Sequence, residues 1–272
     1  MSHARLLSIE VANFKSYQAP MKLDLKPLTV LVGRNNSGKS TLVQVLSLLK
    51  QTLDHPRADV PLNLVGVVEA LNLRELTHGW PEEIGPKQAP TFTLWFESML
   101  DVAQAFAATS KTTESVLVEE GVVALMHRAT RSRVRVTTGI RFQFKEDGRR
   151  VVLTELGLST QGSAAYIRRI NANIRTTPTP RIRVADQVAS KLGVTWDHFI
   201  PHLTLDTKGL GPRDKDRVRY NLWQFCFEQP LADLRELLRG FGFLGSTRAM
   251  PPTLYRVSAA EPPESIGASG EY

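Results

Sequence analysis

Residues 27–41, with the sequence PLTVLVGRNNSGKST, decide the fold of this chain. An uninterrupted apolar run ends on Gly33, which is typical of a strand buried on both faces. The spacing Gly-x-x-x-x-Gly-Lys-Ser follows, and apolar residues then recur at helical intervals as far as Leu53. This helix should end before Pro56. The sequence therefore predicts a buried strand, a phosphate-binding loop and a helix in direct succession.

The loop at 33–41 has the geometry that binds a nucleotide. Its glycines let the backbone fold so that amide N–H groups converge on phosphate oxygens, and the N-terminus of the next helix adds partial positive charge. Lys39 should bridge the β- and γ-phosphates of ATP, and the Ser40 hydroxyl should bind Mg²⁺. The expected cofactors are therefore ATP and Mg²⁺. The loop residues expected to bind them are Gly33, Asn36, Ser37, Gly38, Lys39, Ser40 and Thr41.

Strands are predicted on both sides of the loop. Alternating apolar and polar residues predict two half-buried strands at 7–12 and 22–26, and a third at 91–98. Alternation at 140–145, a turn signal at 146–149 and an apolar run at 151–158 predict a β-hairpin. We expect residues 1–158 to form a nucleotide-binding α/β core with an antiparallel β-subdomain.

The remainder of the chain is predicted to be mainly helical. Residues 100–127 are rich in alanine, and residues 159–240 show helical periodicity that is interrupted at 176–180 and 207–213. We interpret 159–240 as a helical insertion and 241–272 as a return strand followed by an irregular segment. The predicted fold class is α/β, a P-loop NTPase with an antiparallel β-subdomain and a helical insertion.

Composition bears on the location of the protein. Its 42% hydrophobic content is that of a soluble globular chain, and its apolar runs fall far short of the roughly 20 residues that cross a bilayer. Residues 1–7 lack the apolar stretch of a secretion signal. The single cysteine, Cys226, is expected to be a small buried side chain on a helix. We therefore expect a cytoplasmic protein without membrane contact.

Positive charge is concentrated in one short stretch. The formal net charge is +7, and residues 128–150 carry eight basic side chains and two acidic ones. The basic residues are Arg128, Arg131, Arg133, Arg135, Arg141, Lys145, Arg149 and Arg150. They form either a nucleic-acid surface, because neutralised phosphates release counterions, or the solvated face of a β-ribbon. The arginines at 128–135 have no aromatic residues between them to stack on bases, which favours the solvated face.

The segments around the loop resemble a known family. SIEVANFKSY at 8–17 and LDLKPLTVLVGRNNSGKSTLVQVLSLLK at 23–50 have the order and spacing found in ABC-type ATPase heads of the SMC, RecF and OLD-like group. PLNLVGVVEALNLRELTHG at 61–79 and FLGSTRAMPPTLYRV at 243–257 resemble one bacterial subgroup of AAA family ATPases. The resemblance implies the fold and the cofactors that the loop itself predicts.

The resemblance also implies site residues outside the glycines and Lys39. Asn35 matches the asparagine of the family's loop, and Lys15 and Ser16 match residues of the first hairpin that lie near the nucleotide. Arg248 matches an arginine near the nucleotide or a dimer face, although Ser246 stands where the subgroup usually has proline.

Heads of this family need further elements to hydrolyse ATP: a Walker B strand that ends in an acidic pair, a signature loop and a switch histidine. The one weak candidate for the acidic pair, SVLVEE at 115–120, precedes the region where the family places Walker B. We interpret GLSTQG at 157–162 as the end of a strand rather than a signature. The resemblance places the catalytic half after residue 272, so we expect an incomplete head: a fragment, a truncated product or one subunit of a split head.

These observations predict the Mg-ATP-binding part of an ABC/SMC-like ATPase, which hydrolyses ATP only if a C-terminal half or a partner chain completes it. The resemblance implies a homodimer or a partner chain, and a bacterial DNA repair or anti-phage defence setting. The alternative is a non-hydrolysing nucleotide sensor that recruits an effector such as a nuclease. The flanks NFKSY and LTVLVG argue against a P-loop kinase.

Overall fold

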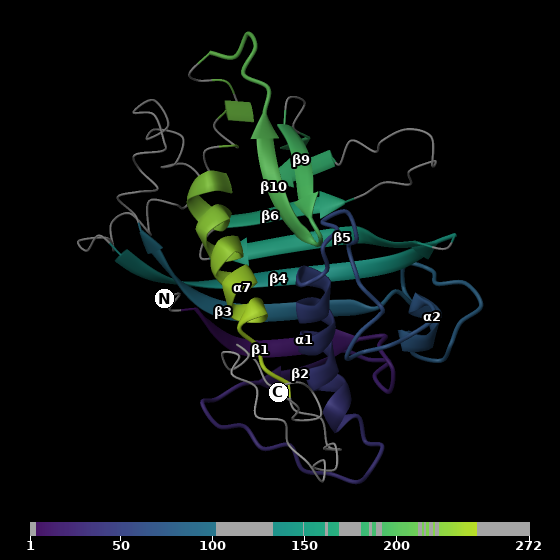
Figure 1. Cartoon of the computed structure of the whole chain (residues 1–272). Coiled ribbons are helices and arrows are strands. Elements are labelled where there is room, and N and C mark those ends of the chain that lie inside the picture. Colours follow the sequence, from purple (N-terminus) through teal and green to yellow (C-terminus); the bar gives the residue numbers. More distant parts are fainter. Residues whose placement is uncertain are drawn as a thin grey trace, which may run out of the picture.

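A computed structural model describes residues 4–101, 133–148, 150–160, 163–168, 181–184, 187–188, 192–211, 214, 216–217, 220 and 223–243. Within these ranges eight strands form one antiparallel sheet in the order β2-β1-β3-β4-β5-β6-β7-β8 (Figure 1). They are β1 (Arg5–Ala12), β2 (Met21–Asp24), β3 (Thr91–Asp101), β4 (Arg133–Asp147), β5 (Arg150–Thr160), β6 (Ser163–Arg168), β7 (Arg181–Val184) and β8 (Gln187–Val188). A separate hairpin consists of β9 (Leu192–Asp197) and β10 (Ile200–Leu205).

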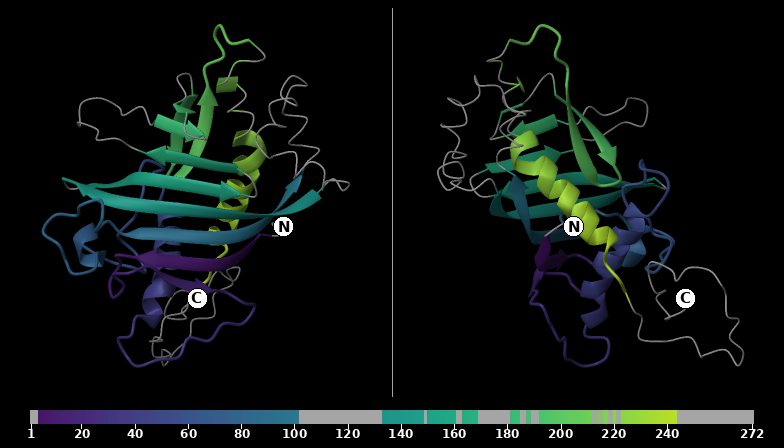
Figure 2. Two further views of the ribbon diagram at one scale, coloured as in Figure 1. Left: turned by 180° about the vertical axis from the view of Figure 1, so that it is seen from behind. Right: turned by 60° about the vertical axis from the view of Figure 1, so that its left-hand side comes forward.

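The described helices are α1 (Lys39–Leu53), α2 (Leu73–Leu76), a π-helical turn η2 (Gln224–Glu228) and α7 (Gln229–Arg239). Helices α1 and α7 pack against one face of the sheet, and the opposite face carries none of the described helices (Figure 2). Helix α1 ends three residues before Pro56, as predicted. Among the described residues, none of the helices has the length and apolar character that crossing a bilayer requires.

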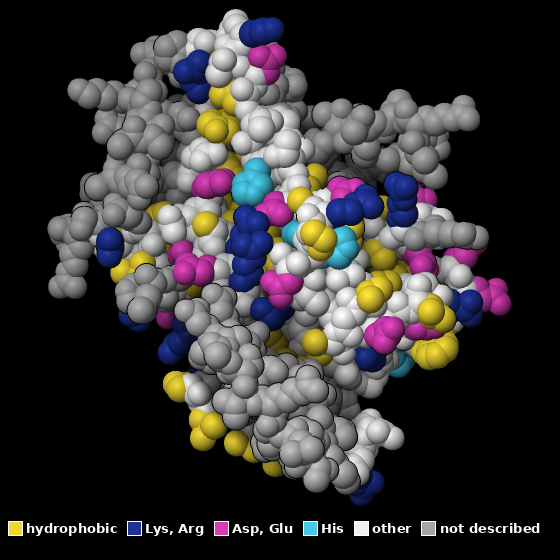
Figure 3. Space-filling model, in the orientation of Figure 1, with side chains coloured by type: hydrophobic (Ala, Val, Ile, Leu, Met, Phe, Trp, Pro, Cys, Tyr) yellow, Lys and Arg dark blue, Asp and Glu magenta, His cyan; other side chains and the backbone are white. Residues whose placement is uncertain are grey.

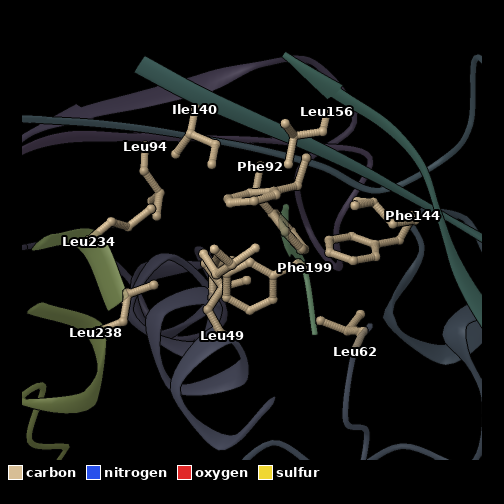
Figure 4. Packing of buried hydrophobic residues seen from close by; sticks show 14 of the residues in the cluster. Leu49, Leu62, Phe92, Leu94, Ile140, Phe144, Leu156, Phe199, Leu234 and Leu238 are labelled. Carbon is tan, nitrogen blue, oxygen red and sulfur yellow. The ribbon is translucent and has the colours of Figure 1, made fainter. Parts of the chain in front are cut away.

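The core lies between the sheet and the two helices. Phe92, Leu94 and Phe96 of β3 are fully buried on one face, which confirms the alternation predicted for 91–98. Leu49 of α1 and Leu234 of α7 meet this face from below (Figure 4). The predicted hairpin is also confirmed, because β4 and β5 pair around a turn at Gly148. Cys226 is buried in η2, as predicted.

The β9–β10 hairpin is fixed to the core by its turn. Phe199 is fully buried, and its ring meets that of Phe142 edge-on at a centroid distance of 4.9 Å. His198 adopts φ 59°, its backbone N–H donates to the carbonyl of Ala58 at 2.6 Å, and its Nδ1 donates to the carbonyl of Val60 at 3.0 Å. Tertiary contacts therefore hold this turn in a left-handed conformation that histidine adopts only occasionally.

The strand predicted at 27–33 is wrong in the structure. This segment has no strand pairing, and Leu28, Val30 and Val32 are 83%, 72% and 87% exposed. Only Leu31 packs against the core. A strand buried on both faces needs neighbours that pair with it and layers that cover it. Within the described residues no strand lies beside this segment, so its apolar pattern remains without partners.

The helical interpretation of 159–240 is also wrong for most of the described residues in that range. Strands β6 to β10 occupy the described part of 163–205, and helical structure is limited to short pieces after 215 and to η2 and α7. Short apolar runs are ambiguous between helix and strand, and here pairing with β5 selects the strand for β6. The domain boundaries predicted at 158 and 240 stay a prediction. The helix predicted at 100–127 and the segment 244–272, with Arg248, lie outside the described residues.

Candidate functional site

The loop at 33–41 lies between β2 and α1 and turns sharply before the helix. Gly38, the residue before α1, adopts φ 87°, which lies in the left-handed region that glycine reaches without strain. A Cβ at this position would lie 2.5 Å from Ser16 Oγ and 2.9 Å from Tyr17 Cζ. Asn36 also has a positive φ, 64°. The loop therefore needs glycine at 38 both for its backbone angle and for its close approach to the first hairpin.

The N-terminus of α1 opens into this loop. No side chain caps the helix, and its first turn contains no acidic residue, so an anion bound at this end would meet no negative charge. Of the first N–H groups, that of Thr41 donates to the carbonyl of Gly38 at 3.0 Å. Lys39 is the first residue of the helix, and its Nζ donates to the carbonyls of Gly33 at 2.8 Å and Arg34 at 2.6 Å. The side chain of Lys39 thus crosses the loop, from the first turn of α1 to the carbonyls of Gly33 and Arg34 at the start of the loop. A phosphate bound in the loop would lie beside this ammonium group.

The first hairpin, residues 13–18, packs directly against the loop. The Tyr17 hydroxyl donates to the carbonyl of Gly38 at 3.1 Å, and Ser16 Oγ lies beside the Gly38 Cα. Phe14 is fully buried and meets Phe92 edge-on at 5.1 Å. The hairpin is therefore anchored in the core at one residue and touches the phosphate-binding loop three residues later.

A second anchor fixes the backbone of Lys15. Its N–H donates to the carbonyl of Leu76 at the end of α2, and its carbonyl accepts from Nδ1 of His78 at 2.8 Å. These two hydrogen bonds hold Lys15 at φ 49°, a conformation in which non-glycine residues are uncommon. Such conformations persist where surrounding contacts determine them, and they are frequent at functional sites.

The side chain of Lys15 reaches toward helix α1. Its Nζ donates to Oε1 of Gln44 at 2.8 Å and lies 5.9 Å from the centroid of the Phe14 ring. Burial lowers the pKa of Lys15 from its ordinary value, because a less solvated ammonium group is harder to keep charged. Within the described residues no carboxylate pairs with this lysine.

These residues surround one pocket of about 610 Å³. Its lining residues are Lys15, Ser16, Asn35, Asn36, Ser37, Gly38, Lys39, Ser40, Thr41 and Gln44. All but Gln44 are residues that the sequence or the family resemblance predicts for the site; Gly33, also predicted, adjoins it and accepts from Lys39. Tyr17 and Gln44 were missed. Helical periodicity could have found Gln44, because it lies one turn after Ser40 on the same face of α1.

The structure describes five residues of the basic stretch, Arg133, Arg135, Arg141 and Lys145 on β4 and Arg150 at the start of β5. Arg128, Arg131 and Arg149 lie outside the described part of the chain. Arg135 and Arg141 are exposed on the sheet face that is opposite to α1 and α7, and within the described residues neither has a partner. Trp95 of β3 lies on this face, where a Cβ at Gly139 would be 2.6 Å from its ring. Strand pairing therefore places an aromatic ring on the same sheet face as these two arginines.

The protein was compared with known families, curated proteins and solved structures. Residues 5–132 match the AAA ATPase domain. This match covers the first hairpin, the loop, α1 and β3. No curated protein and no solved structure gives a significant match to the chain.

Proposed function

Because residues 5–132 belong to the AAA ATPase domain family, an ABC/SMC/RecF-like family of P-loop ATPases, we propose that this chain binds Mg-ATP at the loop 33–41. One observation carries this proposal: a single pocket is lined by Lys15, by Lys39 and by the N-terminus of α1. Two cations, uncapped helix N–H groups and hydroxyl groups are the donors that triphosphates require. Of the described residues that line the pocket, none carries a negative charge.

Each part of the site has a distinct task in the proposal. Lys39 exchanges its two carbonyl partners for phosphate oxygens, and the first N–H groups of α1 donate to the same phosphates. The Ser40 hydroxyl binds Mg²⁺, and Asn35 and Ser16 donate from the two sides of the pocket. Bound Mg-ATP supplies a γ-phosphoryl group that water can attack.

Replacing Lys39 with alanine tests the binding site. The Lys39→Ala variant should bind Mg-ATP roughly 10- to 100-fold more weakly, because one charge-assisted contact to desolvated phosphate contributes about 1.5–3 kcal/mol. Isothermal titration calorimetry measures this difference. Lys50→Ala removes a lysine from the last turn of the same helix and serves as the control, because Lys50 pairs with Asp54 away from the pocket. If Lys39→Ala binds as tightly as the parent, the loop is not a working phosphate site.

Hydrolysis is proposed to depend on a second chain or a further segment. A Walker B carboxylate would have to come from outside the pocket lining described above. The strand that carries it could pair with the exposed segment 27–33. Leu28, Val30 and Val32 project from this segment at alternate positions, and Figure 3 shows hydrophobic side chains along the lower margin, where the loop between β2 and α1 lies. An unpaired segment with exposed apolar side chains at alternate positions can accept a strand from a partner. We propose that the catalytic half adds a strand here.

The alternative function is a nucleotide sensor that does not hydrolyse ATP and recruits an effector such as a nuclease. Turnover measured with and without candidate partner chains distinguishes the two, because only the ATPase gains activity from its partner. A role in bacterial DNA repair or anti-phage defence is supported by family resemblance alone, and the site chemistry is compatible with other processes.

Nucleic-acid binding is a second candidate function, which the open sheet face favours. Arg135 and Arg141 project on this face and are free of carboxylate partners among the described residues, and Trp95 lies between them in register. Cations beside an aromatic ring on an open sheet can bind single strands by phosphate contact and base stacking. Glu10 and Glu97 on neighbouring strands reduce the positive charge, so the expected affinity is modest and depends on salt.

Charge reversal at Arg135 and Arg141 tests this surface. The slope of log affinity against log salt for single-stranded DNA should flatten by about 1.4, because each lost phosphate contact removes roughly 0.7. Fluorescence anisotropy at several salt concentrations gives the slope. Lys26→Glu with Lys87→Glu makes the same charge change elsewhere and should leave the slope nearly unchanged. A parent chain that binds no DNA at 50 mM salt would show that the face is merely solvated.

A further inference from the structure

We infer that Gln44 is a positioning residue, which holds the Lys15 ammonium group at the pocket of the loop 33–41 as a second cation for nucleotide phosphates. The inference rests on the proposed function and extends it. Gln44 and Lys15 belong to elements far apart in sequence, α1 and the first hairpin, and both line the pocket. Their side chains meet at 2.8 Å.

Lys15 is held at both ends, which distinguishes it from an ordinary surface lysine. Its backbone N–H and carbonyl are fixed by Leu76 and His78, and its ammonium nitrogen is fixed by Gln44. Lysine side chains carry about 2 kcal/mol of rotamer entropy, which a free lysine loses when it binds a phosphate. In this structure contacts within the protein have already restricted Lys15, so less of that entropy is lost on binding.

The chemistry of the holding group also matters. Gln44 is neutral and accepts a hydrogen bond from Lys15 without cancelling its charge. A carboxylate at this position would hold the lysine equally well, but it would neutralise the cation and repel phosphate. A hydrocarbon side chain at position 44 would leave the charge of Lys15 intact, but it would not hold the lysine side chain in place. An amide is the side chain that both holds the cation and leaves its charge for a ligand.

The electrostatics of Lys15 agree with this role. Burial lowers the pKa of this lysine, and no described carboxylate opposes that effect. An anion that binds beside a partly desolvated ammonium group favours its charged form more strongly than it would in water. Phosphate binding should therefore raise the pKa of Lys15.

Substitutions at both positions test the inference in the full chain. Lys15→Met should weaken Mg-ATP binding about tenfold or more, as expected for a lost charge-assisted contact. Gln44→Leu should weaken Mg-ATP binding about 3- to 10-fold, because Lys15 is no longer held at the pocket. Gln44→Glu should weaken it by a similar factor, because the new carboxylate cancels the charge of Lys15. Gln18→Glu makes the same charge change on an exposed residue of the same hairpin, outside the pocket lining, and should alter affinity less than about twofold.

A double-mutant cycle separates positioning from general structural damage. In the Lys15→Met background, Gln44→Leu should have no further effect on the Mg-ATP dissociation constant, because its target is gone. NMR of ¹³C-methylated lysines, with the Lys15 signal assigned from Lys15→Met, supplies a second readout. Gln44→Glu should raise the pKa of Lys15, because a nearby carboxylate favours the ammonium form.

Three outcomes would overturn the inference. They are an unchanged affinity of Gln44→Leu in the parent background, an equal loss of affinity in both backgrounds, and an unchanged pKa of Lys15 in Gln44→Glu. In each case Mg-ATP binding that remains sensitive to Lys39→Ala would leave the proposed function intact. A parent chain that binds no Mg-ATP would instead overturn the proposed function, and this inference with it.

Discussion

The 272-residue chain by itself is expected to bind Mg-ATP and to hydrolyse it at or near the background rate, about 10³-fold or more below an active P-loop ATPase. Hydrolysis requires an attacking water in line with the leaving group and neutralisation of the charge on the γ-phosphate oxygens. Lys39, the α1 N-terminus and Ser40 with Mg²⁺ address only the second requirement. Among the described residues that line the pocket, none is acidic, so none supplies a carboxylate that would polarise the water.

Single-turnover measurement with ³²P-labelled ATP checks this expectation, because it detects rates far below steady-state assays. Each missing factor of ten corresponds to about 1.4 kcal/mol in the activation barrier. Addition of a partner that carries the catalytic half should restore turnover, and Lys39→Ala should abolish the restored activity. Hydrolysis at about one per second by the purified, monodisperse chain alone, lost in Lys39→Ala, would contradict the proposal. Glu119 and Glu120, which lie outside the described residues, would then be the first carboxylates to replace.

Gly38→Ala is expected to weaken Mg-ATP binding about 100-fold or more. This effect is at least as large as the roughly 10- to 100-fold loss expected for Lys39→Ala. Two costs combine at this position. A non-glycine residue at φ 87° is strained by about 1–2 kcal/mol, and the new Cβ would overlap Ser16 Oγ at 2.5 Å and the Tyr17 ring at 2.9 Å. Relief requires the Ser16 and Tyr17 side chains, or the loop itself, to move, and together with the backbone strain the cost reaches roughly 3 kcal/mol.

Gly148→Ala provides a matched control for this prediction. Gly148 also has a positive φ, 62°, but no atom lies within 4 Å of the position that its Cβ would take. The substitution should therefore cost about 1 kcal/mol in unfolding free energy through backbone strain and leave Mg-ATP affinity unchanged. Calorimetry and thermal unfolding of both variants provide the comparison. Equal affinities in Gly38→Ala and the parent would show that the contact between loop and hairpin is irrelevant to binding.

Local patterns in the sequence predicted the elements that local interactions can specify. Strict alternation at Phe92, Leu94 and Phe96 marked β3, and the turn signal around Gly148 marked the β4–β5 hairpin. Glycine and lysine spacing located the phosphate-binding loop, and apolar residues at helical intervals located α1 and its end at Leu53. In each case the signal lies within a few residues, so no partner elsewhere in the chain is needed to read it.

The β9–β10 hairpin was missed for the opposite reason. Its turn residues, His198 and Phe199, have none of the Asn-Gly or Asp-Gly chemistry that marks a tight turn in sequence. Contacts with Ala58 and Val60 and burial of Phe199 against Phe142 compensate for this. Burial of one aromatic side chain contributes about 1.5–3 kcal/mol, enough to offset an unfavourable turn residue.

By itself, therefore, the sequence determined the phosphate-binding loop, the helix that follows it and the alternating strands of the sheet. Only the tertiary structure decided that segment 27–33 remains unpaired, that Gln44 meets Lys15, and that Tyr17 packs on Gly38. The physical reason is the range of the interactions. Backbone angles and side-chain periodicity are properties of neighbouring residues, whereas strand pairing and side-chain hydrogen bonds between elements depend on which distant segments the whole fold brings together.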